Sequence, residues 1–333
     1  MIKNIFSKPL IVLTVLLFFL SLNLSCNNNP PPKKLDMVNL AFQKWVGYGP
    51  FFLGKELGIF KDEGIDLNIV DEPLDSARRE AFKEGMLDAE AGTIDLLVSK
   101  LAYDTPITMV LEIDYSFGAD GIVVDGTINN IFDLKGKKVG LVRDDVGEMF
   151  ISYVFNENGL SLNDISSVPT SPEEIVKLFT EKEVDAVVTW EPNLSLCLKR
   201  EGSRILVTTK NNPGVIIDVL SFRNEIIKNN PQLAMRLMRG WFKSLKYYRE
   251  NPAESSRIIA PHYGLKPEEY QAQVLGLRWL NYEDQNSERE FKEWEKAFNF
   301  ISDIKHKNVR IPVIPKADTA INTSLLRSLY YKN

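Results

Sequence analysis

From Leu35 onward the chain alternates short β-like segments with helix-like segments, and this alternation limits its fold more than any other feature. In chain order the β-like segments read LDMVNLAF, IDLNIVDE, ITMVLEID, GIVV, KKVGLV, DAVVTW and RILVTT. Between the first two lies PFFLGKELGIFKDEG, which predicts a helix that a glycine ends. Such alternation is typical of layered domains with mainly parallel strands. We therefore predict an α/β fold.

Two segments about a hundred residues apart follow one pattern. FKEGMLDA ends at Ala89 and FTEKEVDA ends at Ala186; in each, charged residues close a helix and an aliphatic-Asp-Ala step opens a strand. The first of these strands ends in Gly92-Thr93 and the second in Trp190-Glu191. An eight-residue match can also arise by chance, but a chain of about 300 residues is long enough for two lobes of about 150. The pattern indicates two lobes built on one plan.

The last third of the chain changes character and predicts a series of helices. NPQLAMRLMRGWFKSLKYYRE, NPAESSRIIAPHYG, KPEEYQAQVLGLRWL and SEREFKEWEKAFNFISDIK each begin with Asn-Pro, Lys-Pro or Ser-x-x-Glu, which are helix starts. Aromatic residues recur in them at helical spacing, among them Trp241, Phe242, Trp294 and Phe298. We interpret these rings as core packing against one lobe.

The first 26 residues have the layout of an export signal. Two lysines precede the apolar run LIVLTVLLFFL, and NLSC follows it; the run is too short for a comfortable membrane span. A cysteine at this place resembles a bacterial lipoprotein signal, so residues 1–25 are predicted to be removed and Cys26 to be lipidated. Asn23 and Leu24 depart from the usual pattern, which leaves ordinary secretion as the alternative. Residues 26–35, with three prolines, then form a tether.

Charge and cysteine content restrict the partners of the mature chain. Without Lys3 and Lys8 of the signal, 38 of the 40 basic residues remain against 45 acidic ones, so the formal charge moves from −5 to −7. This mild acidity argues against nucleic acid or an anionic membrane surface as a partner. Lipidation of Cys26 would leave Cys197 without a partner, so we expect no disulfide and a passive, partly buried thiol in the helix after Pro192.

A series of motifs resembles the substrate-binding proteins of ABC importers, in the nitrate/sulfonate/taurine branch that shares its domain with thiamine-pyrimidine synthases. The motifs are FQKWVGYGPFFLGKELGIFKDEGIDL, GTIDLLVSKLA, DYSFGADGIVV, DLKGKKVGLV, DAVVTWEP and NPAES, in family order from about Leu40 to Ile259. The resemblance implies a periplasmic-binding-protein type II-like fold, in which two α/β lobes are joined by two crossing strands and hold the ligand between them.

Applied to this chain, the resemblance places the first crossing near Tyr115 to Asp120 and the return near Pro213 to Leu220. Lobe one is then 36–115 plus 219–333, and lobe two is 116–218. The residue pattern agrees with a ligand between the lobes, because open α/β sheets bind ligands beyond the carboxyl ends of their strands.

Several residues at the expected strand ends are candidates for ligand contact, each with a structural alternative. Trp45 and Tyr48 precede the helix amides that begin around Gly49, but they could equally staple that helix. Gly92 admits a close backbone approach and Thr93 can bond the ligand or only cap the next helix. Trp190 can stack on a ligand whose polar group Glu191 holds.

The two crossings supply further candidates. Asp114, Tyr115 and Ser116 lie at the first crossing, where an aspartate can orient a ligand or only satisfy loop amides. Asp218 lies on the returning strand, whose two faces meet the cleft and the packed interior. These positions complete the predicted ligand-binding set.

The stretch VRDDVGEMF departs from the family pattern. Oxyanion-binding members tend to carry Ser, Thr or Gly in this loop, whereas Asp144, Asp145 and Glu148 occupy it here. The acids can complement the helix dipole, but near a ligand they would repel an anion, and Arg143 is the only nearby base. With Asp145 taken as a ligand residue, we predict an amine-bearing or nitrogen-heterocyclic solute; the alternative is an aliphatic sulfonate, taurine or nitrate.

The sequence argues against an enzyme. His262 and His306 are the only histidines, and neither an H-E-x-x-H pair nor a glycine-rich phosphate loop is present. The cysteine-rich signature of the pyrimidine synthases is missing. We expect no cofactor and no metal. The expected protein is an exported, lipid-anchored monomer in the periplasm or cell envelope that delivers a small solute to an ABC permease of the inner membrane; the rival is a surface lipoprotein with a scaffold or adhesin role.

Overall fold

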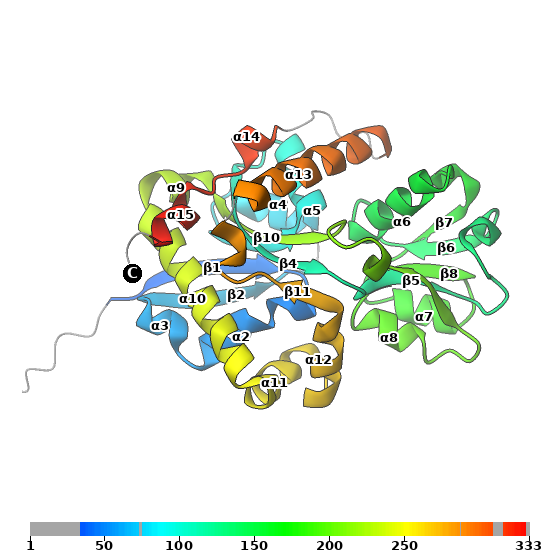
Figure 1. The fold of residues 1–333 in the computed structure, drawn as a ribbon, viewed down its shortest axis with the longest axis horizontal. Helices are drawn as coiled ribbons and strands as arrows, with labels where there is room; N and C mark the ends of the chain where they lie inside the picture. Colours follow the sequence, from blue (N-terminus) through cyan, green and yellow to red (C-terminus); the bar gives the residue numbers. More distant parts are fainter. Residues whose placement is uncertain (1–33, 73–74, 287, 309–315, 331–333) are drawn as a thin grey trace, which may run out of the picture. The chain divides into compact units, whose positions relative to one another are not determined.

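The computed structural model describes residues 34–72, 75–286, 288–308 and 316–330. The predicted signal, Cys26 and most of the predicted tether therefore lie outside the described residues. From Leu35 onward the chain belongs to one compact unit. It contains two sheets covered by helices (Figure 1), which confirms the predicted α/β class.

The first sheet has six strands in the order β11-β4-β10-β3-β1-β2. Strand β1 is parallel to its neighbours β2 and β3, whereas β10 is antiparallel to β3 and β4, and β11 is antiparallel to β4. The strands are β1 (Asp36–Phe42), β2 (Ile65–Asp71), β3 (Ala89–Thr93), β4 (Ile107–Ser116), β10 (Ile217–Arg223) and β11 (Leu277–Trp279). We call the elements around this sheet lobe one.

The second sheet has five strands in the order β7-β6-β8-β5-β9. Strand β6 is parallel to β7 and β8, whereas β5 is antiparallel to β8 and β9. The strands are β5 (Asp120–Val124), β6 (Lys138–Leu141), β7 (Ser166–Pro169), β8 (Ala186–Trp190) and β9 (Arg204–Thr208). We call the elements around this sheet lobe two; the predicted lobe boundaries stay a prediction.

Helices cover both faces of each sheet (Figure 1). In lobe one, α4, α5 and α13 lie on one side of the sheet and α2, α10 and α11 on the other; in lobe two, α6 lies opposite α7 and α8. The helices are α2 (Gly49–Glu56), α3 (Ile59–Asp62), α4 (Asp75–Lys83), α5 (Ile94–Ala102), α6 (Val146–Glu157), α7 (Ile175–Thr180), α8 (Asn193–Cys197), α9 (Asn224–Asn229), α10 (Pro231–Glu250), α11 (Pro252–Ile259), α12 (Pro267–Gln273), α13 (Glu288–Asn308), α14 (Ala317–Ala320) and α15 (Ser324–Tyr330).

The chain passes between the sheets twice. It leaves the first sheet after Ser116 and enters the second at Asp120; it returns between Thr208 and Ile217. At the outgoing crossing the backbone amides of Phe117 and Ala119 both donate to the Gly276 carbonyl, at 2.7 and 3.0 Å. A Cβ on Gly276 would approach the Ala119 nitrogen to 2.9 Å, so this contact requires a glycine. These backbone hydrogen bonds thus connect the outgoing crossing to Gly276, the residue before β11 of lobe one.

Two strands were not predicted from the sequence. Strand β7 reads SSVP, which lacks the apolar character of the other strands. The segment KPEEYQAQVLGLRWL was predicted to be one helix, but α12 ends at Gln273 and Leu277–Trp279 pairs with β4. Long-range pairing of Arg278 with Tyr115 here overrides the local helical pattern.

The aromatic residues of the late helices behave largely as predicted. Trp241, Trp294 and Phe298 are buried in the core of lobe one. Phe242 is partly buried and contacts Tyr282 edge to face, with ring centroids 5.4 Å apart. Cys197 ends α8 and is fully buried, rather than partly buried as predicted, and burial raises the pKa of its thiol to about 12. Such a thiol is unreactive at neutral pH.

Candidate ligand-binding site

A small cavity lies where strands of both sheets end. Strands β1, β3 and β8 end beside it, and β5 and β10 begin beside it. Its lining residues are Gln43, Trp45, Tyr48, Thr93, Asp120, Val146, Trp190, Ile216 and Asp218. Five of the predicted ligand residues are among them: Trp45, Tyr48, Thr93, Trp190 and Asp218. The cavity is about 10 Å³, which is room for about one water molecule, so the cleft is closed in this conformation and a solute enters only when it opens.

Two indole rings, one from each lobe, face the cavity. Trp45 follows β1, and its Nε1 donates to both carboxylate oxygens of Asp114 at 3.3 Å. A Cβ on Gly47 would lie 2.3 Å from Asp114 Oδ2 and from Trp45 Nε1, so a glycine is required for this bond. Trp190 ends β8, and its Nε1 donates to the Lys44 carbonyl of lobe one at 3.4 Å. The Trp190 bond therefore joins the two lobes across the cleft.

Three carboxyl groups gather here: Asp120 and Asp218 line the cavity, whereas Asp114, a predicted ligand residue, lies behind it. The strand register explains this, because Asp218 of β10 pairs with Thr93 of β3 on one side and with Asp114 of β4 on the other. Asp120 begins β5 and pairs with Trp190. All three side chains are buried, and in the part of the chain that the structure describes no lysine, arginine or histidine forms an ion pair with any of them. We call them the carboxyl cluster.

Burial dominates the titration of the carboxyl cluster. Burial, with the Asp218 charge next in size, raises the pKa of Asp114 well above its ordinary value. Burial also raises the pKa of Asp120 well above the ordinary value, and that of Asp218 to about 7. The Tyr48 hydroxyl donates to Asp218 Oδ1 and opposes part of this effect. The cluster therefore holds protons near neutral pH.

Two buried polar atoms at the cavity have no hydrogen-bond partner: Thr93 Oγ1 and Asp120 Oδ2. Thr93 occupies the N-cap position of α5, yet its side chain makes no capping hydrogen bond. Buried polar groups are nearly always paired, and each unpaired one costs about 1–3 kcal/mol. Both atoms are thus available to a ligand.

Three helix N-termini converge on the same place. Tyr48 and Thr93 are the N-cap residues of α2 and α5, and Val146 is the first residue of α6; all three line the cavity. The first backbone amides of a helix have no partner inside it and carry a partial positive charge. The cavity therefore combines the partial positive charge of helix N-termini with buried carboxyl groups.

The other predicted ligand residues do not line the cavity. Ser116 Oγ lies 2.7 Å from Thr209 Oγ1, and Glu191 accepts hydrogen bonds from the backbone nitrogen and the hydroxyl of Ser195 at 3.1 and 2.7 Å. Asp145 caps α6 by accepting from the Val146 amide at 2.6 Å, and burial raises its pKa to about 7. Gly92 lies within β3, and Tyr115 is a partly buried residue of β4.

The acidic loop before α6 is mostly turned to solvent. Arg143 and Asp144 are exposed, and Glu148 accepts a hydrogen bond from the Asp144 amide at 2.8 Å. Of the six acids that the sequence placed near the ligand, only Asp218 lines the cavity. A seventh acid, Asp120, which was not predicted, lines it as well. The sequence-based argument for strong repulsion of an anion is correspondingly weaker.

Sequence reasoning missed four lining residues: Gln43, Asp120, Val146 and Ile216. Gln43 follows β1 directly, while Asp120 and Ile216 lie at the two crossings, so their positions could have indicated a role in the site.

The sequence analysis also missed the buried bases near the cleft. Arg78 acts on the titration of Asp145, and Lys305 Nζ donates to the Asp144 carbonyl at 3.3 Å. Both bases lie in helices, and nothing in the sequence marks them as buried.

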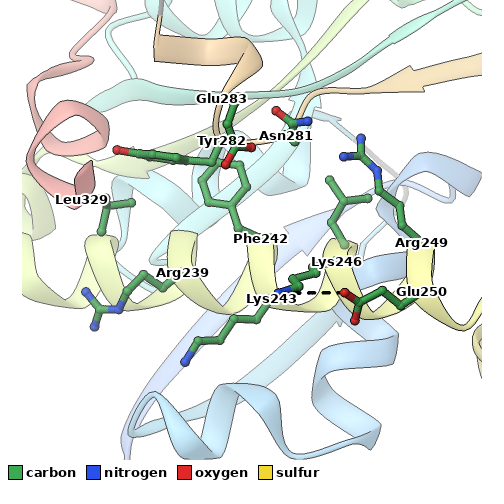
Figure 2. A pocket seen from close by; sticks show the side chains of 11 residues that line it. Arg239, Phe242, Lys243, Lys246, Arg249, Glu250, Asn281, Tyr282, Glu283 and Leu329 are labelled. Carbon is green, nitrogen blue, oxygen red and sulfur yellow. Dashed lines mark ion pairs between the residues drawn. The ribbon is translucent and has the colours of Figure 1, made fainter. Parts of the chain in front are cut away.

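A larger cavity of about 500 Å³ runs along α10 and is closed on the other side by residues that follow β11 (Figure 2). Phe242, Leu245 and Leu329 give it apolar walls, and basic side chains stand at its rim. Arg239 and Lys243 are paired with Glu63, and Lys246 with Glu250. The smaller cavity remains the candidate site, because it lies at the strand ends and holds the unpaired polar atoms.

Within the described ranges, no group of three or more His, Cys, Asp or Glu side chains is arranged to hold a metal ion. Nor does any described helix combine the length and the apolar character that crossing a membrane requires.

Residues 45–255, more than half of the chain, match the model of the family described as NMT1/THI5 like. The chain belongs to that family. This confirms the resemblance inferred from the sequence motifs. The family match includes every lining residue of the cavity except Gln43.

Individual relatives are distant. A putative aliphatic sulfonates-binding protein of Bacillus subtilis (strain 168) is 27% identical over 267 residues, which cover 76% of this chain and 77% of that protein. A putative binding protein of Brucella abortus (strain 2308) is 24% identical over 149 residues, 43% of this chain, so the chain spans about half (46%) of that relative's length. The periplasmic aliphatic sulphonate binding protein SsuA of Escherichia coli superposes with a TM-score of 0.71 at 17% identity, covering 88% of this chain and 99% of that one. This likeness establishes the periplasmic-binding-protein fold of this NMT1/THI5 like chain.

Proposed function

We propose that this chain is the solute-binding component of an ABC importer of the sulfonate/nitrate type and captures a small molecule in the cleft between its lobes. The observation that carries the proposal is the closed cavity at the strand ends, with Trp45, Thr93 and Asp218 on one side and Asp120 and Trp190 on the other. Opening and closing about two chain crossings is the ordinary motion of such a two-lobed protein. The sulfonate-binding name of the Bacillus subtilis relative supports the transport class.

The ligand that best fits this proposal is an aliphatic sulfonate or a related oxyanion. The sequence-based expectation of an amine-bearing ligand depended on several acids facing the solute. Of those acids only Asp218 lines the cavity, and the unpredicted Asp120 is the other acid that does so. Three converging helix N-termini favour an anion. The Thr93 hydroxyl, which has no other partner, can donate to its oxygens, and the two indoles can cover its aliphatic part. An amine or nitrogen heterocycle becomes the second candidate.

The proposed protein is a binder and has no catalytic role. It would be exported and would deliver its solute, as a monomer, to a permease of the inner membrane. We further propose that Cys26 is acylated and anchors the chain, which is tested by comparing how the parent and Cys26→Ser proteins partition into detergent. Equal partition would contradict the anchor.

The binding role is tested with residues 35–333, which form one compact unit. A thermal-shift series would use ethanesulfonate, taurine, nitrate and ethylamine. A ligand at a hundred times its dissociation constant stabilises the protein by about 2.7 kcal/mol, so a bound solute raises Tm. Trp190→Ala removes the lobe-two wall and should abolish the shift, whereas Trp294→Phe, a core change away from the cavity, should keep it.

Closure is tested separately by small-angle scattering with and without the solute that gives the largest shift. The proposed hinge motion predicts a smaller radius of gyration at saturation. Absence of any saturable binding would contradict the importer role and favour the scaffold or adhesin alternative.

A further inference from the structure

Asp114 and Asp218 form a buried pair of neighbouring carboxyl groups. They occupy paired positions on the antiparallel strands β4 and β10, and both side chains are buried. Two carboxylates held side by side away from water repel each other, which favours protonation of at least one of them. The arrangement therefore favours a proton in the closed cleft.

Lobe one supplies one donor to each member of this pair. Trp45 Nε1 donates to both oxygens of Asp114, and the Tyr48 hydroxyl donates to Asp218 Oδ1. Both donors are uncharged, so neither compensates the charge of an ionised carboxyl group.

The groups that act most strongly on the pKa values of the carboxyl cluster are acidic or neutral. Those facing Asp218 are Tyr48 before α2, Asp114 on β4 and Asp95 on α5; those facing Asp120 are Ser116 on β4, Asp218 on β10, Glu191 after β8 and Asp145 before α6; those facing Asp114 are Trp45, Glu112, Asp120, Asp218, Tyr263 and Tyr270. Of the bases near the cleft, Arg78 acts on Asp145, Lys305 acts on Asp75 and Asp95, and Lys44 lines a second hollow together with Gln43 and Trp190. The surroundings therefore favour protonated over ionised carboxyls.

A ligand in the cavity meets Asp218 and Asp120 directly. Both line it, and Asp120 Oδ2 is buried without a hydrogen-bond partner, as is the neighbouring Thr93 Oγ1. We propose that Asp218 and Asp120 bind the ligand as neutral carboxyl groups, each donating an O–H hydrogen bond to an anionic oxygen, so that capture of a sulfonate is coupled to the protonation of the cleft. This inference rests on the proposed solute-binding function and specifies how its site accepts an anion.

The coupling has a definite sign. Burial places the pKa of Asp218 at about 7 in the empty cleft, and a bound anion favours the protonated form further. The proton needed for binding is present below about pH 6 and is lost above pH 7. Affinity for a sulfonate should therefore be constant at low pH and fall by up to about tenfold per pH unit above 7. A cationic amine requires the ionised carboxylates and should show the opposite trend.

The test uses isothermal titration of residues 35–333 with ethanesulfonate, and with ethylamine in parallel, from pH 5.5 to 8.5. Ethanesulfonate remains an anion throughout this range, so any pH dependence belongs to the protein. Titration at pH 7.5 in two buffers with different ionisation enthalpies counts the protons taken up on binding. The expected result is up to about one proton taken up and the fall in affinity described above.

Two variants locate the effect. Asp218→Asn and Asp120→Asn cannot ionise at the substituted position, so in each variant the fall in ethanesulfonate affinity above pH 7, taken relative to the same variant at pH 6, should be smaller than in the wild type. Asp66→Asn, an exposed position on β2, is the matched control and should behave like the wild type. The proton count on the wild type does not depend on whether any variant folds.

Each outcome decides between the two proposals. Ethanesulfonate binding that weakens above pH 7 with proton uptake supports the inference. Binding without pH dependence or proton uptake overturns it and leaves the importer function intact. Binding of ethylamine alone, strengthening with pH, overturns it together with the anionic ligand class. Failure of both probes at every pH overturns both proposals.

Discussion

Two buried charged clusters lie close to the cleft and differ in how their charges are compensated. The paired cluster consists of Asp75, Arg78, Glu90 and Lys100; Glu90 Oε1 accepts from both Arg78 Nε and Lys100 Nζ at 2.9 Å, and Lys100 also bonds Asp75. Among the described residues, no cation is paired with the carboxyl cluster of Asp114, Asp120 and Asp218. The charges of the first cluster are balanced within it, whereas those of the second are balanced only by protons or by a ligand.

The titration of the two clusters reflects this difference. Burial works to raise the pKa of Asp75, but Lys100 and Arg78 hold it below its ordinary value. In the carboxyl cluster burial and neighbouring acids act in the same direction, so the pKa values rise. Acids paired with cations are structural features, whereas buried acids without cations at a strand-end cavity are candidates for ligand contact.

The largest effect is expected from breaking the paired cluster. Lys100→Met leaves Glu90 and Asp75 buried with less compensation, and removal of one partner from a buried ion pair costs about 3–5 kcal/mol. Urea unfolding at pH 7 measures this loss in the free energy of unfolding. Lys246→Met is the control, because its pair with Glu250 is exposed and 3.9 Å long and such pairs contribute at most about 1 kcal/mol. A loss below about 1 kcal/mol for Lys100→Met would show that the cluster is hydrated rather than paired.

The carboxyl cluster should give a pH dependence of stability on the order of a few kcal/mol. The pKa of Asp218 is raised to about 7 in the folded chain, against roughly 3.9 when unfolded. The contribution of Asp218 to the free energy of unfolding is therefore fully present below about pH 4 and is lost as the pH rises through 7. Urea unfolding between pH 4 and 8 should show a smaller decline for Asp218→Asn than for the wild type. Parallel curves would mean that the carboxyl is hydrated and ionises freely.

The sequence predicted the alternating fold because periodicity is a local property, and it missed β11 because that strand exists only through its pairing with β4. Part of the site could be predicted from the same local patterns. Trp45, Thr93 and Trp190 could be placed at the cavity because strand ends meet at one edge of a sheet.

Long-range register decided the rest of the site. It sets Asp218 between Thr93 and Asp114 and makes Asp114 a partner of Trp45 behind the cavity. The proximity of Lys100 to Glu90 likewise arises from packing of α5 against β3 and has no sequence signature.

The next effect concerns the bond between Trp45 and the carboxyl cluster. In Gly47→Ala the added Cβ meets Asp114 Oδ2 and Trp45 Nε1 at 2.3 Å, so the indole must move away from Asp114. We expect ethanesulfonate to bind about tenfold more weakly, or about 1.4 kcal/mol, the size of one hydrogen bond. Calorimetry at pH 6 measures it. Gly92→Ala is the control, since its Cβ meets only Glu90, at 3.6 Å and beyond. Equal affinity in both variants would remove Trp45 from the binding surface.

The smallest effect separates binding from stability at Thr93. Its buried hydroxyl has no hydrogen-bond partner, so Thr93→Val, which keeps the shape, should change the free energy of unfolding by less than about 0.5 kcal/mol. If the hydroxyl donates to the ligand, ethanesulfonate should bind about 2- to 12-fold more weakly, which corresponds to about 0.5–1.5 kcal/mol. Thr105→Val is the matched control, because that hydroxyl is also buried without a partner but does not line the cavity. A loss of affinity in Thr93→Val alone assigns the hydroxyl to the ligand, whereas equal losses in both variants, or none in either, would leave only the carboxyl cluster and the helix amides as its polar partners.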